Sequence, residues 1–366
     1  MAAIVKVDFE YFRVPLEETL VDAKHGDHTH FELITCALAT ADGLEGIGYT
    51  YTGGLGGRAI LALLRYDLGP YLLGRDADGI EALWNDLQWR VHYVARGGIA
   101  SFAISAVDIA LWDIRGRKSG LPLWKMAGGG GRTARVYAGG IDLDFGLEKL
   151  LANTRRYLGS GFRGVKIKVG RERLSDDFDR ALAVREVLGR ENVFMVDANM
   201  VWPVDTAIKA ARFFRKETGA LWLEEPTVPD DHQGYERIGR EGGLAIGSGE
   251  NLHTIFEFRQ AIEVGRIAYP IIDAGNIGGV TGFLKVAGLA GAHNLPACSH
   301  GMQELHVSLV AGVANPGWVE AHSFPIDRYT ARPLVLEGGM GVAPDAPGTG
   351  VEFRRGLLEP YKEIPF

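Results

Sequence analysis

The chain has 366 residues, of which 46% are hydrophobic and 23% are charged, and its formal net charge is −7 at pH 7. This balance is typical of a globular protein, and the absence of a block rich in lysine or arginine argues against nucleic acid as a partner. No apolar run reaches the roughly 18 residues needed to cross a bilayer, so no membrane partner is expected.

The chain is expected to stay in the cytoplasm. Its first residues lack the basic stretch and the apolar run of a secretory signal peptide. Its two cysteines, Cys36 and Cys298, are too few for a disulfide framework, which agrees with a reducing compartment.

Residues 1–131 predict an N-terminal α+β domain. Alternating apolar residues indicate an antiparallel sheet built from residues 5–9, 31–39 and 46–51. Helical apolar spacing follows in three segments, at residues 59–71, 80–94 and 99–117. A proline and four successive glycines then end this pattern, so we place a domain boundary near Arg132.

Residues 132–323 alternate short apolar runs with amphipathic helical segments, which is the pattern of βα units in a parallel sheet. The strand candidates are residues 136–139, 164–169, 193–197, 221–224, 244–249, 268–273, 295–299 and 318–320. No helix clearly follows the eighth strand, so the predicted fold class is α/β, a (β/α)7β modified TIM barrel with the N-terminal part as a capping domain. Residues 324–366 are rich in proline and glycine and are predicted to pack back on the capping domain.

A polar residue stands at or just past the end of seven of these runs, and their spacing is the strongest functional signal in the sequence. The seven residues are Lys168, Asp197, Glu224, Glu250, Asp273, His300 and Glu320. Successive members lie 20 to 29 residues apart, which is about one βα unit. A parallel barrel brings the C-terminal ends of its strands to one face, so these side chains are expected to converge there. A solvated strand end explains any one of them more easily than the whole series.

Three of these residues, Asp197, Glu224 and Glu250, come from adjacent strands and offer only oxygen ligands. Such ligands suit a hard cation, Mg²⁺ or alternatively Mn²⁺, and not zinc. Three converging carboxylates would raise one another's pKa unless a cation were present. The structural alternative is an ion network with lysines. Asn199 either assists at this site or only caps the loop.

Candidate acids and bases come from the same strand ends. Lys166 and Lys168 lie two residues apart on one strand, so both point into the barrel, and neighbouring ammonium groups are expected to lower the pKa of at least one. Asp273 and His300 end adjacent strands, which allows the carboxylate to orient the imidazole and raise its basicity. Glu320 either donates a hydrogen bond to a substrate carboxylate, when protonated, or belongs to a buried ion pair.

These residues resemble the enolase superfamily in its mandelate racemase-like branch. The segments that match are Lys166 with Lys168, residues 196–199, 222–226, 249–250, 277–282 after Asp273, and 299–300, with residues 105–113 similar to the capping-domain signature. Two departures are Asn276, where mandelate racemase has lysine, and Ile272, where many relatives have proline.

The resemblance implies a role for each residue. It implies a metal at Asp197, Glu224 and Glu250. It also implies bases at Lys168 and His300, with Asp273 as the partner of His300. Lys166 and Glu320 are implied to lie beside the oxygens of the substrate carboxylate.

The implied reaction is removal of the proton next to a substrate carboxylate, through an enediolate. A base contributes about 3 to 5 kcal/mol, less than the roughly 8 to 23 kcal/mol that enzymes supply, so the surrounding charges must contribute the rest. Three outcomes stay open: racemisation or epimerisation of a 2-hydroxy acid, dehydration, and ring opening by a cycloisomerase.

Residues 22–30 and 49–54 fall where the capping loops of this family close the mouth, which implies Lys24, His25 and Tyr51 as substrate contacts. Both loops are polar, which favours an acid sugar and so a role in carbohydrate acid metabolism, although a solvated surface loop explains the histidines equally well. The whole chain, including residues 300–306, also resembles cycloisomerases of 3,6-anhydro-L-galactonate, and the family implies a homo-oligomer.

Two alternatives come from other classes of protein. A Schiff-base aldolase on a similar barrel would use Lys166 or Lys168 as a nucleophile toward a carbonyl, but it would not need three converging carboxylates. A non-catalytic sugar-acid binder would keep the pocket without turnover, and the presence of both Lys168 and His300 argues against it.

Overall fold

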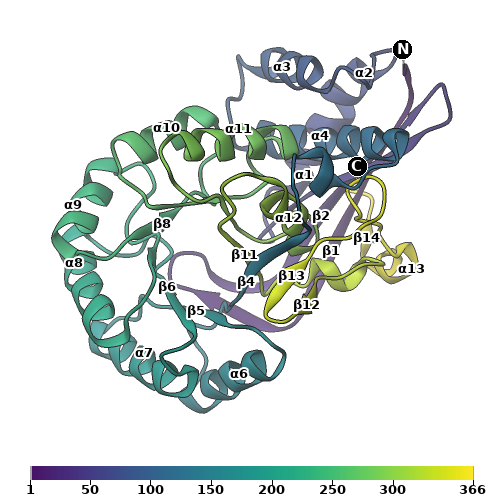
Figure 1. Ribbon diagram of the computed structural model, residues 1–366. Coiled ribbons are helices and arrows are strands. Elements are labelled where there is room, and N and C mark those ends of the chain that lie inside the picture. The colour runs from purple at the N-terminus through teal and green to yellow at the C-terminus, as the bar shows by residue number, and fades with distance from the viewer. Residues whose placement is uncertain (1, 366) are drawn as a thin grey trace.

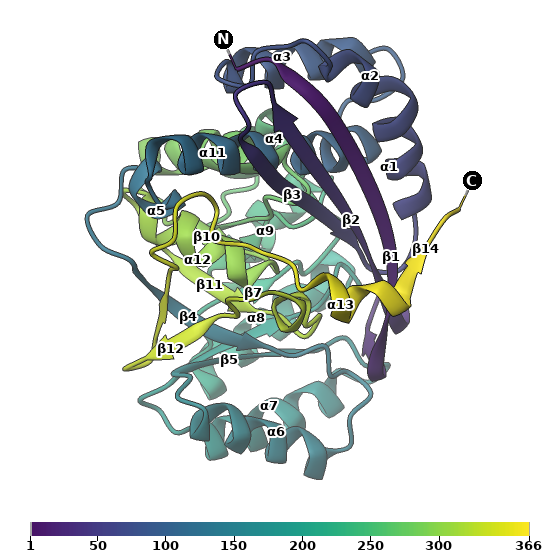
Figure 2. The same cartoon turned by 90° about the vertical axis from the view of Figure 1, so that its right-hand side faces the viewer.

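The computed structural model describes residues 2–365 and places a capping domain of sheet and helices against the mouth of a barrel (Figure 1). The antiparallel capping sheet has the order β14-β1-β2-β3. Its strands are β1 (Ile4–Asp22), β2 (Gly26–Thr40), β3 (Glu45–Thr52) and β14 (Lys362–Glu363). Figure 2 shows β1 and β2 as long curved strands that run from the outer helices down to the barrel.

The strand β1 runs 13 residues beyond the range expected from the sequence, because its second half lacks regular alternation. The register between β1 and β2 shifts between Pro15 and Leu20, and pairing then resumes as far as Asp22 opposite Gly26. This extension forms a hairpin that reaches the barrel mouth.

Helices pack on one face of this sheet. They are α1 (Gly57–Leu63), η1 (Leu64–Leu68), α2 (Gly69–Leu72), α3 (Ile80–Val91) and α4 (Ile99–Ser119). The short α5 (Leu123–Met126) instead packs against the barrel helix at Gln303–Gly312. The strand β3 needs Gly48 where α4 crosses it, because a side chain there would collide with the backbone at Ala106. Close contact between sheet and helix follows from this glycine, and apolar residues of both fill the core between them.

The barrel consists of eight parallel strands, as the sequence predicted. They are β4 (Thr133–Gly139), β5 (Gly164–Lys168), β6 (Val193–Asp197), β7 (Leu223–Glu224), β8 (Ile246–Ser248), β9 (Tyr269–Ile272), β10 (Cys298–Ser299) and β11 (Trp318–Ala321). Each strand pairs with the next along the chain from β4 to β10, and β11 pairs with β4. A parallel bridge between Ala297 and Pro316 closes the remaining gap.

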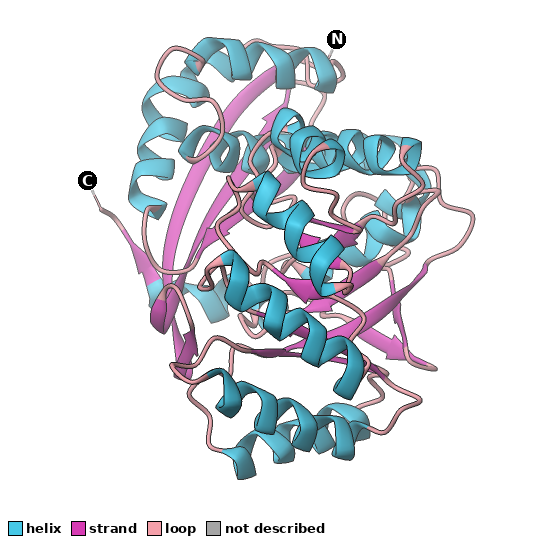
Figure 3. Ribbon diagram, turned by 90° about the vertical axis from the view of Figure 1, so that its left-hand side faces the viewer, coloured by secondary structure: helices cyan, strands magenta, loops and turns pink. Residues whose placement is uncertain are grey.

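Helices follow seven of the eight barrel strands and form its outer ring (Figure 3). They are α6 (Leu147–Gly159), α7 (Leu174–Leu188), α8 (Val204–Phe213) with η2 (Phe214–Thr218), α9 (His232–Gly242), α10 (Ile255–Glu263), α11 (Gly279–Ala292) and α12 (Gln303–Gly312). The element directly after β11 is the short 3-10 helix η3 (Ile326–Tyr329) and not a barrel helix. The (β/α)7β prediction is therefore confirmed.

The C-terminal segment contacts both parts of the molecule. The hairpin of β12 (Val335–Glu337) and β13 (Met340–Val342) extends the barrel sheet beside β4. After α13 (Arg355–Leu358) and η4 (Glu359–Tyr361), β14 pairs with β1 at Tyr11 and Phe12. Within residues 2–365, no helix has the length and the apolar character that spanning a membrane requires.

Candidate active site

The C-terminal ends of the barrel strands and the tips of the capping strands enclose a cavity of about 670 Å³. Of the predicted site residues, those that line it are Lys168, Asn199, Glu250, Asp273, His300, His25 and Tyr51. Four others, Lys166, Asp197, Glu224 and Glu320, are buried at the strand ends in contact with this group. Lys24 is exposed in the hairpin turn and does not line the cavity.

The three predicted metal ligands lie together. Asp197 ends β6, Glu224 ends β7 and Glu250 follows β8, and each offers one ligand oxygen within 4.8 Å of the others. Burial raises the pKa of Glu224 to about 8, although the Lys166 ammonium acts in the opposite direction. A carboxylate cluster this deep needs positive charge to stay ionised.

The surroundings of this cluster fit a hard cation. Among the described residues, Glu250 Oε2 and Asn199 Oδ1 are buried oxygens without a hydrogen-bond partner. The backbone N–H of Asn199 donates to Asp197 Oδ1 at 2.9 Å, which fixes that carboxylate. The candidate ligand atoms of Asp197, Glu224 and Glu250 are all oxygens, and such a donor set suits Mg²⁺ or Mn²⁺.

Both lysines of β5 make ion pairs with the carboxylates. Lys166 Nζ lies 2.5 Å from Glu224 Oε1 and 2.9 Å from Glu320 Oε1, and Lys168 Nζ lies 2.6 Å from Asp197 Oδ2. Burial lowers the pKa of Lys166, but Glu224 and Glu320 outweigh it and hold that pKa well above its usual range. Asp197 likewise holds the pKa of Lys168 above its usual range despite burial.

The expected lowering of a lysine pKa is therefore wrong for this arrangement. Each ammonium has a carboxylate at hydrogen-bond distance, and this attraction exceeds the repulsion between the two lysines. The ion network considered as the structural alternative is present, and it uses the same oxygens that form the candidate metal site.

An Asp–His pair lies at the ends of β9 and β10. His300 Nδ1 lies 2.9 Å from Asp273 Oδ2, and His300 Nε2 lies 3.5 Å from Glu250 Oε2. Burial opposes protonation, but Glu250 and the hydrogen bond to Asp273 together raise the pKa of His300 to about 10. The imidazole is thus oriented by one carboxylate and faces the metal-ligand cluster with its other nitrogen.

Tyr51 links the capping domain to this pair. Its hydroxyl, at the end of β3, donates to Asp273 Oδ2 at 2.8 Å and lies 3.1 Å from His300 Nδ1. The sequence indicated a substrate contact for this residue. The structure places it in the cavity wall and also against Asp273 and His300.

Glu320, near the end of β11, forms a buried ion pair with Lys166, which is one of the two roles that the sequence left open. Burial alone would raise its pKa, but Lys166 and the nearby histidines lower it, so the carboxylate is ionised. Its Oε2 lies 3.9 Å from His300 Nε2, so the carboxylate stands between Lys166 and His300.

Two buried or half-buried groups at the mouth were not found from the sequence. Asp142 follows β4, and its Oδ1 accepts the backbone N–H of Lys168 at 2.9 Å, with burial raising its pKa to about 6. His322 lies two residues beyond Glu320, with its ring centroid 4.9 Å from that of His300. Side chains two residues apart on a strand point the same way, so the position of His322 two residues after Glu320 could have predicted that it also faces the mouth. Asp142 lies in a loop three residues past β4, where no such periodicity applies.

Strained turns accompany these strand ends. Asn199 and Glu225 have φ values of 40° and 38°, just after β6 and β7, and Met302 has a φ of 41° after β10. Non-glycine residues in this region are costly and cluster at functional sites.

Comparison with known proteins gives matches over both parts of the chain. Residues 14–128 match the N-terminal domain of the mandelate racemase / muconate lactonizing enzyme family, and residues 149–357 match the family described as enolase C-terminal domain-like.

Three similar proteins cover almost the whole chain. The 3,6-anhydro-alpha-L-galactonate cycloisomerase of Streptomyces coelicolor is 47% identical, over 95% of this chain and 96% of its own length. A structure described as a racemase from the same species with bound magnesium has a TM-score of 0.95 and 46% identity, covering 98% of this chain and 100% of that one. The L-talarate dehydratase of a Polaromonas species, complexed with Mg and L-glucarate, has a TM-score of 0.94 and 30% identity, covering 100% and 98%.

Proposed function

The chain belongs to the mandelate racemase / muconate lactonizing enzyme family of the enolase superfamily, and from this premise we propose that it is a Mg²⁺-dependent enzyme that removes the α-proton of an acid sugar and then eliminates the β-oxygen. The elimination is either a dehydration or the opening of an anhydro ring. The observation that carries the proposal is the placement of Lys168 and His300 beside one carboxylate cluster in the wall of one cavity.

Asp197, Glu224 and Glu250 would hold Mg²⁺, with Mn²⁺ as a substitute. When bound, the ion supplies positive charge that offsets these carboxylates and stabilises negative charge developing on the substrate carboxylate. Lys166 reaches the same region from β5 and would donate hydrogen bonds to one substrate oxygen. Glu320 is proposed to hold Lys166 in place.

Lys168 and His300 are the proposed acid and base. One removes the α-proton, and the electron pair of the broken C–H bond forms the double bond of the enediolate. That pair then expels the β-oxygen, which takes a proton from the other residue, and the resulting enol tautomerises to a 2-oxo-3-deoxy acid. Asp273 and Tyr51 keep the His300 ring oriented through its Nδ1 side.

Ring opening of 3,6-anhydro-L-galactonate is the outcome we favour. The cycloisomerase of Streptomyces coelicolor supports it, since it shares 47% identity over nearly all of both chains. Polar side chains from the capping hairpin line the cavity, which suits a substrate with several hydroxyl groups.

Racemisation of a 2-hydroxy acid is a second candidate, because two bases at one site allow a proton to leave one face and return on the other. The similar Streptomyces coelicolor structure described as a racemase favours it. A Schiff-base aldolase has less support, since it would need a nucleophilic lysine but not the three carboxylates that converge beside Lys166 and Lys168.

A substrate screen tests the proposal. The purified chain with Mg²⁺ is incubated in deuterated water with a set of acid sugars that includes 3,6-anhydro-L-galactonate, galactarate and L-talarate. We expect a 2-oxo-3-deoxy acid carrying deuterium from at least one of them. Deuterium at the α-carbon with inversion and no elimination would assign the racemase reaction. Absence of both exchange and product across the set would overturn the proposal.

We also propose that the chain works as a cytoplasmic homo-oligomer, as the family resemblance implies. Size-exclusion chromatography with light scattering would test the assembly, and a mass equal to one chain would contradict it.

A further inference from the structure

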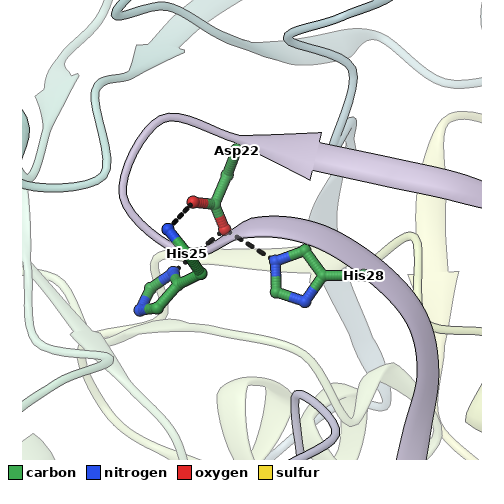
Figure 4. A group of neighbouring side chains, drawn as sticks. All are labelled: Asp22, His25 and His28. Atoms are coloured by element: carbon green, nitrogen blue, oxygen red, sulfur yellow. Dashed lines mark hydrogen bonds and ion pairs between the residues drawn. The ribbon is translucent and has the colours of Figure 1, made fainter.

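A second group of metal-ligating side chains lies at the tip of the capping hairpin, in the wall of the same cavity. Asp22 ends β1, His25 stands in the turn and His28 lies on β2 (Figure 4). One ligand atom from each lies within 4.8 Å of the other two. The proposed elimination reaction assigns no role to Asp22 or His28.

Both imidazoles converge on one oxygen of Asp22. His25 Nδ1 lies 3.0 Å and His28 Nε2 lies 2.8 Å from Asp22 Oδ2 (Figure 4). The other oxygen, Oδ1, accepts the backbone N–H groups of Lys24 at 2.9 Å and His25 at 2.7 Å. The backbone therefore fixes the carboxylate so that Oδ2 faces the two rings.

His28 is held so that both ring nitrogens face oxygen atoms. Its Nδ1 lies 3.4 Å from the carbonyl oxygen of Gly53, while its Nε2 faces Asp22. A neutral imidazole carries one N–H, so it satisfies only one of these acceptors. Either a second proton or a metal ion at Nε2 satisfies both oxygens. With a metal ion, the N–H donates to the Gly53 carbonyl and the Nε2 lone pair binds the ion. Metal-binding histidines commonly donate their second N–H to a carbonyl in this way.

The cluster is also tied to the barrel. Val21 bridges to Asp142, and the backbone N–H of Leu143 donates to the carbonyl of Val21 at 3.0 Å. His28 is buried and packs edge-on against Phe324, with ring centroids 5.5 Å apart. These contacts hold two of the three ligands in place before any ion binds.

We propose that Asp22, His25 and His28 form a binding site for a divalent transition metal such as Zn²⁺ or Co²⁺, separate from the carboxylate site. Two imidazole nitrogens and one carboxylate oxygen match the ligands that such ions prefer and that Mg²⁺ does not. Ligand atoms around tetrahedral zinc stand about 3.3 Å apart for bonds of about 2.0 Å, so the observed 2.8 Å and 3.0 Å need only a small widening.

Three protein ligands leave a coordination position open, and all three residues line the cavity. That position would take an oxygen from a hydroxyl or carboxylate group of the bound acid, a statement that rests on the proposed function. Metal uptake itself does not depend on it.

The test is metal binding by the full chain without substrate. With Mg²⁺ in large excess to hold the carboxylate site, Zn²⁺ is titrated by calorimetry, and Co²⁺ is followed by visible absorption. We expect one further ion per chain and the intense Co²⁺ absorption of a low-coordinate site with nitrogen ligands. His28→Ala should weaken this binding by more than about tenfold, or about 1.4 kcal/mol.

His30→Ala is the matched control, since His30 lies on the same strand but outside the cluster, and binding should be unchanged. Because His28 is buried, His25→Ala serves as a second variant whose side chain is 49% exposed. Absence of a further ion in the Mg²⁺-loaded wild type would overturn the proposal, as would uptake unaffected by both variants. Either result would leave the proposed reaction untouched, because no turnover is measured.

Discussion

The barrel mouth and the tip of the capping hairpin both carry clusters of carboxylates and basic side chains, but they hold them differently. At the barrel mouth, Lys166, Asp197 and Glu224 are almost completely buried, and each comes from a different strand. At the hairpin tip, Asp22 ends β1 and His25 stands in the turn three residues later, with its side chain half exposed. Groups fixed by a closed barrel suit a conserved reaction step, while groups on a loop suit the choice of substrate.

Removal of the divalent metal from the carboxylate site of the barrel should lower turnover more than any other change. Without a cation, the buried carboxylates of Asp197 and Glu224 keep both lysines ion-paired, so Lys168 cannot act as a base. We expect chelation to abolish turnover and added Mg²⁺ to restore it. Glu224→Gln should weaken Mg²⁺ binding in calorimetry while the melting curve stays cooperative. Full activity in metal-free protein would contradict the account.

Loss of either proposed base should have the next largest effect. A positioned acid or base contributes about 10² to 10⁴ in rate, so Lys168→Ala and His300→Asn should each lower kcat by at least that range. Steady-state kinetics with the substrate found by screening measures this. A variant that keeps wild-type kcat would remove that residue from the mechanism.

Tyr51→Phe tests whether the capping domain takes part in the chemistry. A hydrogen bond to a charged group contributes about 1.5 to 3 kcal/mol, so loss of the Tyr51 bond to Asp273 should lower kcat by roughly 10- to 100-fold. Tyr49→Phe is the matched control, because Tyr49 is buried on the same strand but donates to Glu304. Equal losses in the two variants would indicate a general effect on stability and not on the catalytic pair.

Substitutions in the hairpin turn are expected to change the kinetic constants least. His25→Ala should raise KM by up to about tenfold with little change in kcat, because uniform binding is lost without loss of a reacting group. Lys24→Ala should have a smaller effect, since Lys24 does not line the cavity. A larger effect from Lys24 than from His25 would mean that the turn rearranges when substrate binds.

The sequence predicted the barrel well because short apolar runs bounded by glycine and charged residues mark each strand. The predicted strand at residues 244–249 starts before the observed strand β8, which begins at Ile246, because Leu244 is apolar and buried but lies in the preceding loop. The long hairpin of β1 and β2 was missed because Pro15, Glu17 and Glu18 interrupt the alternation of apolar residues.

For the candidate site as well, the residues of the barrel could be predicted from the sequence and those of the capping hairpin could not. Spacing alone identified Asp197, Glu224 and His300, because a parallel barrel turns regular spacing into convergence. The capping residues Asp22 and His28 carried no such signal, since their role depends on where a hairpin docks. The direction of the lysine pKa shifts also could not be predicted, because it depends on distances of 2.5 and 2.6 Å to carboxylates from other strands.

Deuterium incorporation at the α-carbon of the substrate in Lys168→Ala and His300→Asn would show which of the two residues removes the α-proton. With 3,6-anhydro-L-galactonate in deuterated water, NMR should find no elimination product in either variant, and α-proton exchange in only one of them. The variant that still exchanges keeps the residue that removes the proton, and the other residue protonates the leaving oxygen. Exchange in both variants would point to two-base racemisation. Wild-type product formation in either variant would contradict the assignment of the two bases.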